Sequence, residues 1–177
     1  NTLVAAVFSG GSIGERDYSL RLTLGKGCEE RITAAVETLA GGYRVVHDVD
    51  GRKTWEISPC RGQAPLARAL VALGAPKGTK NEKADVSLPS YLWDAPELIR
   101  LDFARTYLLN RGHTRRDRPE MPVQLGESRS DRFREELVAL LRSLVDEPTG
   151  VRPSGDRLVY IYPEAADELF MPPTLGE

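Results

Sequence analysis

Apolar and polar positions alternate along this chain in a way that predicts a mixed protein of helices and strands. Leucines occupy every second position of residues 20–24, against Arg21 and Thr23, which predicts a strand with one buried face. Apolar residues at helical spacing predict a helix over 28–40, and the glycine pair 41–42 ends it. Asp50 and Gly51 form a strong turn dipeptide, so we expect a hairpin over 43–58 and a further helix over 64–73.

The second half of the chain predicts the same series of elements. We expect a strand over 121–125, a helix over 131–144, a hairpin through Ser154 and Gly155, and a last helix near 164–170. An apolar helix precedes the first strand of each half, at 3–9 and at 96–110. The expected order of elements is therefore α-β-β-α-β-β-α, twice.

A shift of 101 positions lays the second half over the first. Gly11 then falls on Gly112 and Leu24 on Leu125, and a slip of three residues aligns 54–59 with 158–163. We interpret these matches as two copies of one unit. The expected organisation is a first repeat over 1–74, a polar, lysine-bearing connection over 75–95, and a second repeat over 96–177.

Composition and charge narrow the class of protein. The 177 residues are 41% hydrophobic and 28% charged, which is typical of a globular protein, and no apolar run is long enough to span a membrane. Cys28 and Cys60 lack the partners and spacing of a zinc site, so we expect thiols in a reducing, cytoplasmic compartment. The net charge of −2 weighs against a strongly basic nucleic-acid-binding protein, although basic side chains can still gather on one face. Since the chain begins at Asn1, a processed protein or a piece of a larger one are both open interpretations.

Two glycine-ended helices, the doubled unit and the segment "SLPSYLWDAPELIRLDFARTYLL" at 87–109 resemble one family. The chain resembles the monomeric LAGLIDADG homing endonucleases, including those carried inside inteins, over almost its whole length. The resemblance implies an α/β (α+β) fold of two pseudo-symmetric αββαββα repeats that form a saddle over the DNA major groove. It also implies two signature helices side by side at a pseudo-twofold axis. Each delivers one acidic residue, just before its last glycine, to a divalent metal.

The acidic positions of that motif hold other residues in this chain. The positions before the terminal glycines are Gly10 and Arg111, and Phe8 and Leu109 stand at the other acidic position. Hard cations such as Mg²⁺ need carboxylate oxygens, which neither glycine nor arginine offers. We therefore expect a DNA-binding protein that has lost metal-dependent cleavage and needs no cofactor.

Two alternatives remain open. One is an active endonuclease that binds Mg²⁺ through non-standard ligands, for which Glu15, Asp17 and Asp117 are candidates, assisted by a linker lysine such as Lys77. The other is a protein-interaction or regulatory domain of a larger DNA-binding protein. The expected partner is double-stranded DNA, with structured RNA as a second nucleic-acid candidate.

The candidate DNA contacts are polar residues, because long basic and amide side chains suit phosphates and base edges. They lie on the expected strand faces, on the hairpin tips and in the basic run after the second helix. These candidates are Arg21, Thr23, Arg44, Arg52, Lys53, Arg115, Arg116, Arg118 and Gln124. The aromatic residues Trp55, Tyr160 and Tyr162 have the spacing of core residues, and we expect them to pack rather than to stack on bases.

Overall fold

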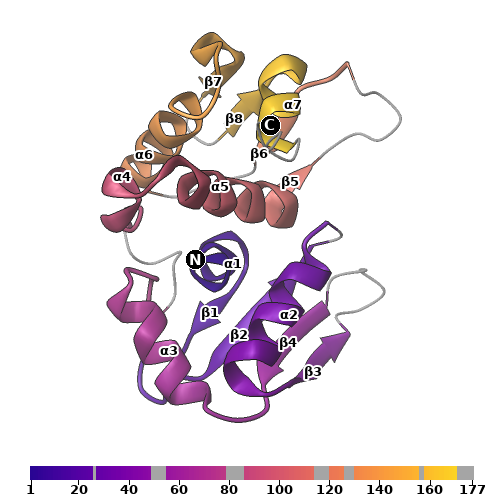
Figure 1. Cartoon of the computed structure of the whole chain (residues 1–177), viewed down its shortest axis with the longest axis vertical. Coiled ribbons are helices and arrows are strands. Elements are labelled where there is room, and N and C mark those ends of the chain that lie inside the picture. The colour runs from indigo at the N-terminus through magenta and orange to yellow at the C-terminus, as the bar shows by residue number, and fades with distance from the viewer. Residues whose placement is uncertain are drawn as a thin grey trace, which may run out of the picture.

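Two four-stranded antiparallel sheets lie at opposite ends of the molecule, with a pair of helices between them (Figure 1). The computed structural model describes residues 1–25, 27–48, 55–78, 86–113, 120–125, 130–155 and 158–170. The first half contains α1 (Thr2–Ser9), β1 (Ser12–Ile13), β2 (Leu20–Leu24), α2 (Glu29–Ala40), β3 (Tyr43–Asp48), β4 (Trp55–Pro59) and α3 (Gln63–Ala72). The second half contains α4 (Tyr91–Asp94), α5 (Glu97–Arg111), β5 (Gly112–His113), β6 (Val123–Leu125), α6 (Asp131–Arg142), the 3₁₀ turn η1 (Pro148–Gly150), β7 (Val151–Ser154), β8 (Leu158–Ile161) and α7 (Pro163–Phe170).

The strand order is the same in both sheets. It is β1-β2-β4-β3 in the first and β5-β6-β8-β7 in the second, and every neighbouring pair is antiparallel. Leu22 pairs with Ile57 in the first sheet, and Val123 pairs with Ile161 in the second. These two pairs agree with the shift of 101 positions and with the three-residue slip read from the sequence.

The expected series α-β-β-α-β-β-α is confirmed, and the structure locates the strands that the sequence pattern left unplaced. These are β1 and β5, which have two residues each and directly follow α1 and α5. Such short strands give no measurable alternation of apolar and polar positions. The expected strand over 121–125 begins two residues later, at Val123, and the expected helix over 131–144 ends at Arg142.

The core is built around α1, which is apolar on every side and almost completely buried. Its Phe8 ring makes an edge contact with Phe103 of α5 at 5.9 Å and stacks on Phe133 of α6 at 5.5 Å between centroids. Aromatic pairs of this geometry add to the gain from buried area. Phe8 therefore joins three helices.

The connection between the halves contacts both of them. The Gly78 amide donates to the Ile13 carbonyl at 2.8 Å, next to β1. The Leu88 amide donates to the Glu136 carboxylate at 2.6 Å, and Leu92 in the short helix α4 is buried. Within the described ranges, no helix is long and apolar enough to cross a membrane.

Candidate nucleic-acid interface

The helices α1 and α5 lie side by side, and hydrogen bonds join them at both ends. At their C-terminal ends, the Asn110 amide Nδ2 donates to the Ser9 hydroxyl at 2.7 Å. At their N-terminal ends, the Asn1 amide Nδ2 donates to the Asp102 carboxylate at 2.6 Å. Both pairs are separated by 101 positions, which is the offset of the sequence repeat. A residue can contact its own symmetry equivalent only on a twofold axis, so the pseudo-twofold axis runs between the two helices.

Asn110 is a junction at this end of the helix pair. Besides its bond to Ser9, its Nδ2 donates to the Thr23 carbonyl at 3.0 Å, and its Oδ1 accepts the Gly25 amide. Gly25 is also closely packed, because a Cβ there would lie 2.5 Å from the Asn110 carbonyl oxygen. The side chain of Asn110 thus fixes the end of β2 to both helices. The sequence reading missed this residue, and the only signal for it was its offset from Ser9.

The terminal glycines of the two helices are required by close packing. A Cβ at Gly11 would lie 2.9 Å from the Arg21 carbonyl oxygen, and at the same distance from Leu22 Cδ2 and Val7 Cα. A Cβ at Gly112 would lie 2.6 Å from the carbonyl oxygen four residues earlier in α5. Contacts of this length do not occur for real side chains, so both glycines allow the following strand to leave its helix closely.

Gly10 and Arg111, which precede the two terminal glycines, lie at this same end and carry no carboxylate. Gly10 ends α1, and its carbonyl accepts the Thr23 hydroxyl at 2.8 Å. Arg111 is the last residue of α5, and its guanidinium donates to the Ser9 carbonyl at 3.0 Å. Two helix C-termini side by side bring together partial charges of about −0.5 each. The positive charge of the Arg111 side chain therefore lies beside the partial negative charges of the two helix C-termini.

The residues at the helix ends do not fit a divalent metal. Hard cations need several oxygen ligands, and no group of three or more acidic, histidine or cysteine residues that could hold one occurs among the described residues. Of the alternative ligands, Asp17 accepts the Ser19 amide at 3.1 Å, and this bond lowers the pKa of the Asp17 carboxyl. Asp17 thereby shapes the turn before β2. Asp117 lies outside the described residues.

Lys77, the linker lysine that the structure describes, contacts a tyrosine. Lys77 Nζ lies 3.9 Å from the centroid of the Tyr18 ring, and the Arg68 guanidinium lies 5.0 Å from it. A hydrogen bond and the charge of Lys77, together with the charge of Arg68, lower the pKa of the Tyr18 hydroxyl. Tyr18 itself has φ of +53°, in the left-handed region that side chains other than glycine rarely adopt. The contact of Lys77 is thus with the turn between β1 and β2.

The candidate DNA contacts that the structure describes lie on one face of each sheet. Leu20, Leu22 and Leu24 of β2 are buried against the helices, as the alternation predicts, so the opposite face of that sheet is open. We use the name open face for this side of each sheet, away from the buried strand residues. Arg21 and Arg44 are exposed.

Thr23 and Gln124 are less available than the two arginines. Both are partly buried on the open faces of β2 and β6. The Thr23 hydroxyl donates a hydrogen bond to the Gly10 carbonyl, so towards any other partner it can only act as an acceptor. The remaining candidates, Arg52, Lys53, Arg115, Arg116 and Arg118, lie outside the described residues.

The prediction that the strand aromatics pack in the core is wrong. Trp55 is 52% exposed and Tyr162 is 38% exposed. In β8, Val159 and Ile161 are the buried residues, and Tyr160 alternates with them on the open face, where it is only partly buried. These rings are available to a partner.

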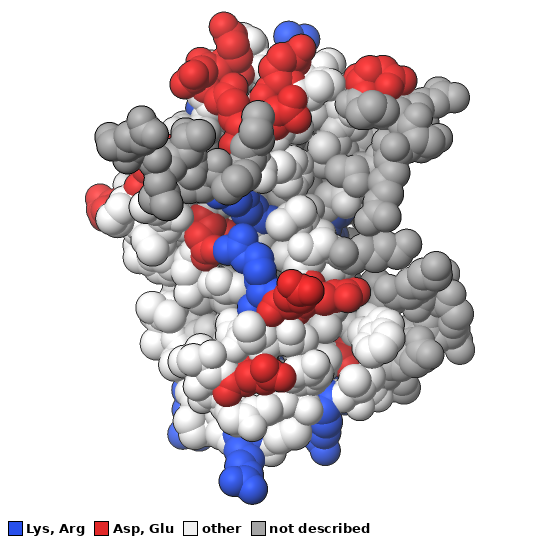
Figure 2. Space-filling model, turned by 45° about the vertical axis from the view of Figure 1, so that its right-hand side comes forward, with Lys and Arg blue, Asp and Glu red and all other residues white. Residues whose placement is uncertain are grey.

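Charge is unevenly distributed over the surface. On the face drawn in Figure 2, acidic side chains gather mainly at the upper end, and Lys and Arg form a narrow run across the middle. The helices behind the sheets carry exposed acids, such as Glu29 and Glu30 of α2 and Asp131 and Glu135 of α6. Arginines match these acids in number in α6, which has three of each, but not in α2, which has three acids and one arginine.

Comparison with solved structures identifies the fold. The homing endonuclease I-WcaI bound to its DNA recognition sequence is similar in structure, with a TM-score of 0.60 and 11% sequence identity. The match covers 96% of this chain and 76% of the I-WcaI chain. I-DmoI in complex with DNA and Mn is also similar, with a TM-score of 0.54 and 11% sequence identity, and the match covers 95% of this chain and 90% of the I-DmoI chain. No protein-family profile and no curated protein matches the sequence. The two sheets have the same strand order and flank a pair of helices, and the structural match covers nearly the whole chain. This protein therefore has the fold of the LAGLIDADG homing endonucleases.

Proposed function

We propose that this chain binds double-stranded DNA through the open faces of its two sheets and does not cleave it. The observation that carries the proposal is the contrast at the helix ends. Gly11 and Gly112, which the close packing requires, are kept, whereas the acidic positions beside them hold Gly10 and Arg111. The solved proteins of this fold were captured on DNA, which supports the choice of partner.

Arg111 supports metal-independent binding. Its guanidinium stands at the C-terminal ends of both helices, where it offsets their partial negative charge. DNA phosphates approaching this point would meet a cation that belongs to the chain. The expected affinity is therefore the same with Mg²⁺ and with a chelator at equal ionic strength.

We further propose that residues 1–74 and 96–177 are the two repeats and that 75–95 connects them. The matching strand registers and the two hydrogen bonds across the axis at the repeat offset support this division.

The test is a titration of labelled duplex DNA at two salt concentrations, with and without Mg²⁺, with cleavage scored on the same samples. Each phosphate contact releases counterions, so the binding constant falls as the salt concentration rises. Loss of one contact makes the slope of log binding constant against log salt concentration less negative by about 1. We expect Arg21→Ala and Arg44→Ala each to do so. Arg132→Ala is the matched control, because Arg132 lies on the backing helix α6 and pairs with Glu136 at 3.0 Å.

Each outcome is informative. Salt-dependent binding with intact DNA supports the proposal. Cleavage that requires Mg²⁺ would show that other ligands replace Gly10 and Arg111. Absence of duplex binding at low salt would overturn the proposal and direct attention to protein partners.

A further inference from the structure

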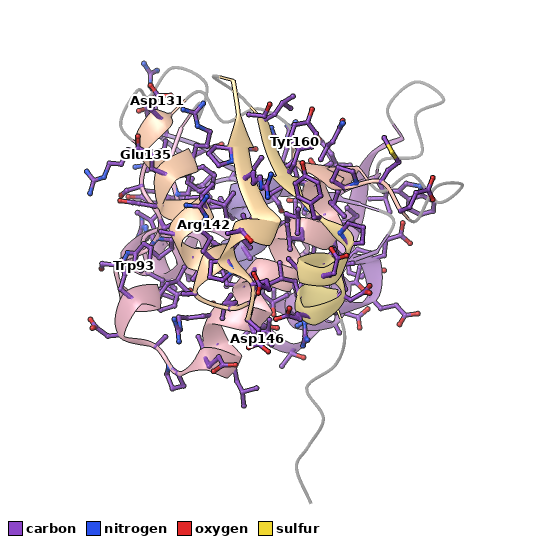
Figure 3. The ribbon with its side chains drawn as sticks, turned by 90° about the horizontal axis from the view of Figure 1, so that it is seen from above. Trp93, Asp131, Glu135, Arg142, Asp146 and Tyr160 are labelled. Atoms are coloured by element: carbon purple, nitrogen blue, oxygen red, sulfur yellow. The ribbon has the colours of Figure 1, made fainter. Side chains whose placement is uncertain are left out.

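The open face of the second sheet carries two tyrosine rings, Tyr160 and Tyr162. Tyr160 of β8 pairs directly with Gln124 of β6 on one side and with Arg152 of β7 on the other. Residues opposite each other in a sheet share a face. An amide, a phenol ring and a guanidinium thus form one row across three strands. Seen from above, Tyr160 lies on the side of β7 and β8 away from α6, which bears Asp131 and Glu135 (Figure 3).

A second ring continues this row. The Arg152 guanidinium lies 5.1 Å from the centroid of the Tyr162 ring, and its Nε donates to the Thr149 carbonyl at 2.8 Å. These two contacts hold the guanidinium in place. Arg152 is exposed and Tyr162 is 38% exposed, so the stacked pair faces solvent.

A pocket of about 260 Å³ lies at the end of the row, lined in part by Tyr162, Arg152, Glu147 and Glu164. It is smaller than the roughly 300–1,000 Å³ of pockets for drug-sized ligands, so it suits a single planar group. A ring, a guanidinium and two carboxylates are complementary to a nucleobase, whose exocyclic amino group donates to carboxylates and whose face stacks on aromatic rings.

The first sheet has a different chemistry at the equivalent place. By the repeat offset and the slip, Glu56 occupies the position of Tyr160, and Thr23 pairs with it where Gln124 pairs with Tyr160. His47 pairs with Glu56 where Arg152 pairs with Tyr160, so the centre of this row holds a carboxylate in place of the phenol ring. The open faces of the two sheets therefore differ in chemistry, although their strands are ordered alike.

We infer that the open face of the second sheet binds unpaired bases, by stacking on Tyr160 and Tyr162 and by seating one base in the adjacent pocket. In an intact duplex the faces of the bases are covered by their neighbours, so a protein ring has nothing to stack on. Unpaired bases expose those faces, and the exposed charge of Arg152 is complementary to their phosphates. The inference rests on the proposed function and names its ligand more closely, as a nucleic acid with a duplex part and an unpaired part.

The experiment compares two fluorescent DNA probes of one sequence, a complete duplex and the same duplex with a short unpaired bubble. The variants are Tyr160→Thr, which removes the ring but favours a strand, and Tyr160→Phe, which keeps the ring. We expect the whole chain to prefer the bubble by about fivefold to a hundredfold, the range for stacking of one or more bases. Tyr160→Thr should abolish the preference and Tyr160→Phe should keep it. Arg21→Ala should weaken both probes equally.

A spectroscopic measurement checks the same point independently of affinity. A fluorescent adenine analogue in the bubble should be quenched by the protein, and Tyr160→Thr should restore its fluorescence. Equal binding of the two probes, or a preference unchanged in Tyr160→Thr, would overturn this inference and leave duplex binding standing. Absence of binding to either probe would overturn the proposed function as well.

Discussion

The side chain of Asn110 should be one of the most important polar groups for the stability of this protein. It donates to the Ser9 hydroxyl at 2.7 Å and to the Thr23 carbonyl at 3.0 Å, and it accepts the Gly25 amide. Each hydrogen bond contributes about 0.5–1.5 kcal/mol net, and a buried donor or acceptor left without a partner costs about 1–3 kcal/mol. Because this site is partly buried, water can replace some of the lost partners. We expect Asn110→Ala to lower the free energy of unfolding by about 2–4 kcal/mol.

Urea unfolding followed by circular dichroism measures this loss, and Thr38→Ala is the matched control. Thr38 is exposed on α2, and its hydroxyl donates to the Ala34 carbonyl within the same helix at 2.8 Å. Removal of such a surface group changes stability by about 0.5 kcal/mol or less. A loss below about 1 kcal/mol for Asn110→Ala would refute the view that this residue fastens the two halves together.

Three further predictions concern packing and titration. Phe8→Ala removes the ring that joins three helices and should cost about 3–5 kcal/mol in urea unfolding, whereas a value near 1 would mean that the neighbouring rings close the cavity. Gly11→Ala should destabilise the protein more than Gly10→Ala. A Cβ at Gly11 would meet three atoms at 2.9 Å, whereas the closest neighbour of a Cβ at Gly10 is a side-chain carbon at 3.1 Å. Equal melting temperatures of the two variants would contradict this. Burial raises the pKa of the Cys28 thiol from 9.0 to about 11, so its contribution to stability is complete below pH 9 and is lost as the pH rises through 11. Cys28→Ala should unfold with a flatter pH dependence over that window, and at pH 8 a thiol reagent should modify the exposed Cys60 and leave native Cys28 unreacted.

The sequence predicted those elements whose faces differ in polarity. The leucines of β2 alternate with polar residues, so its buried face could be read directly. In β8 the run Leu158–Ile161 contains no polar residue, and periodicity alone could not separate the buried Val159 and Ile161 from the outward Tyr160. The mistaken assignment of Tyr160 to the core follows from this uniform composition.

The site was only partly accessible from the sequence for a second reason. The resemblance of the sequence to the family was enough to single out Gly10 and Arg111, without coordinates. The function of Asn110 depends on three partners 85 to 101 positions away, and the sheet pairing that sets Tyr160 beside Arg152 also depends on the fold. Long-range hydrogen bonds and strand register leave no local pattern in the sequence.

The contacts across the axis also bear on how this molecule could have diverged. In a symmetric homodimer of the second half, a residue on the axis would face its own copy, so Asp102 would face a second aspartate. In the single chain the partners differ: Asp102 accepts from Asn1, and Arg111 donates to the Ser9 carbonyl. Like-charge repulsion between the two aspartates would oppose self-association of an isolated second half. A single chain with two different halves can therefore carry a charge on this axis that a dimer of identical subunits would repel.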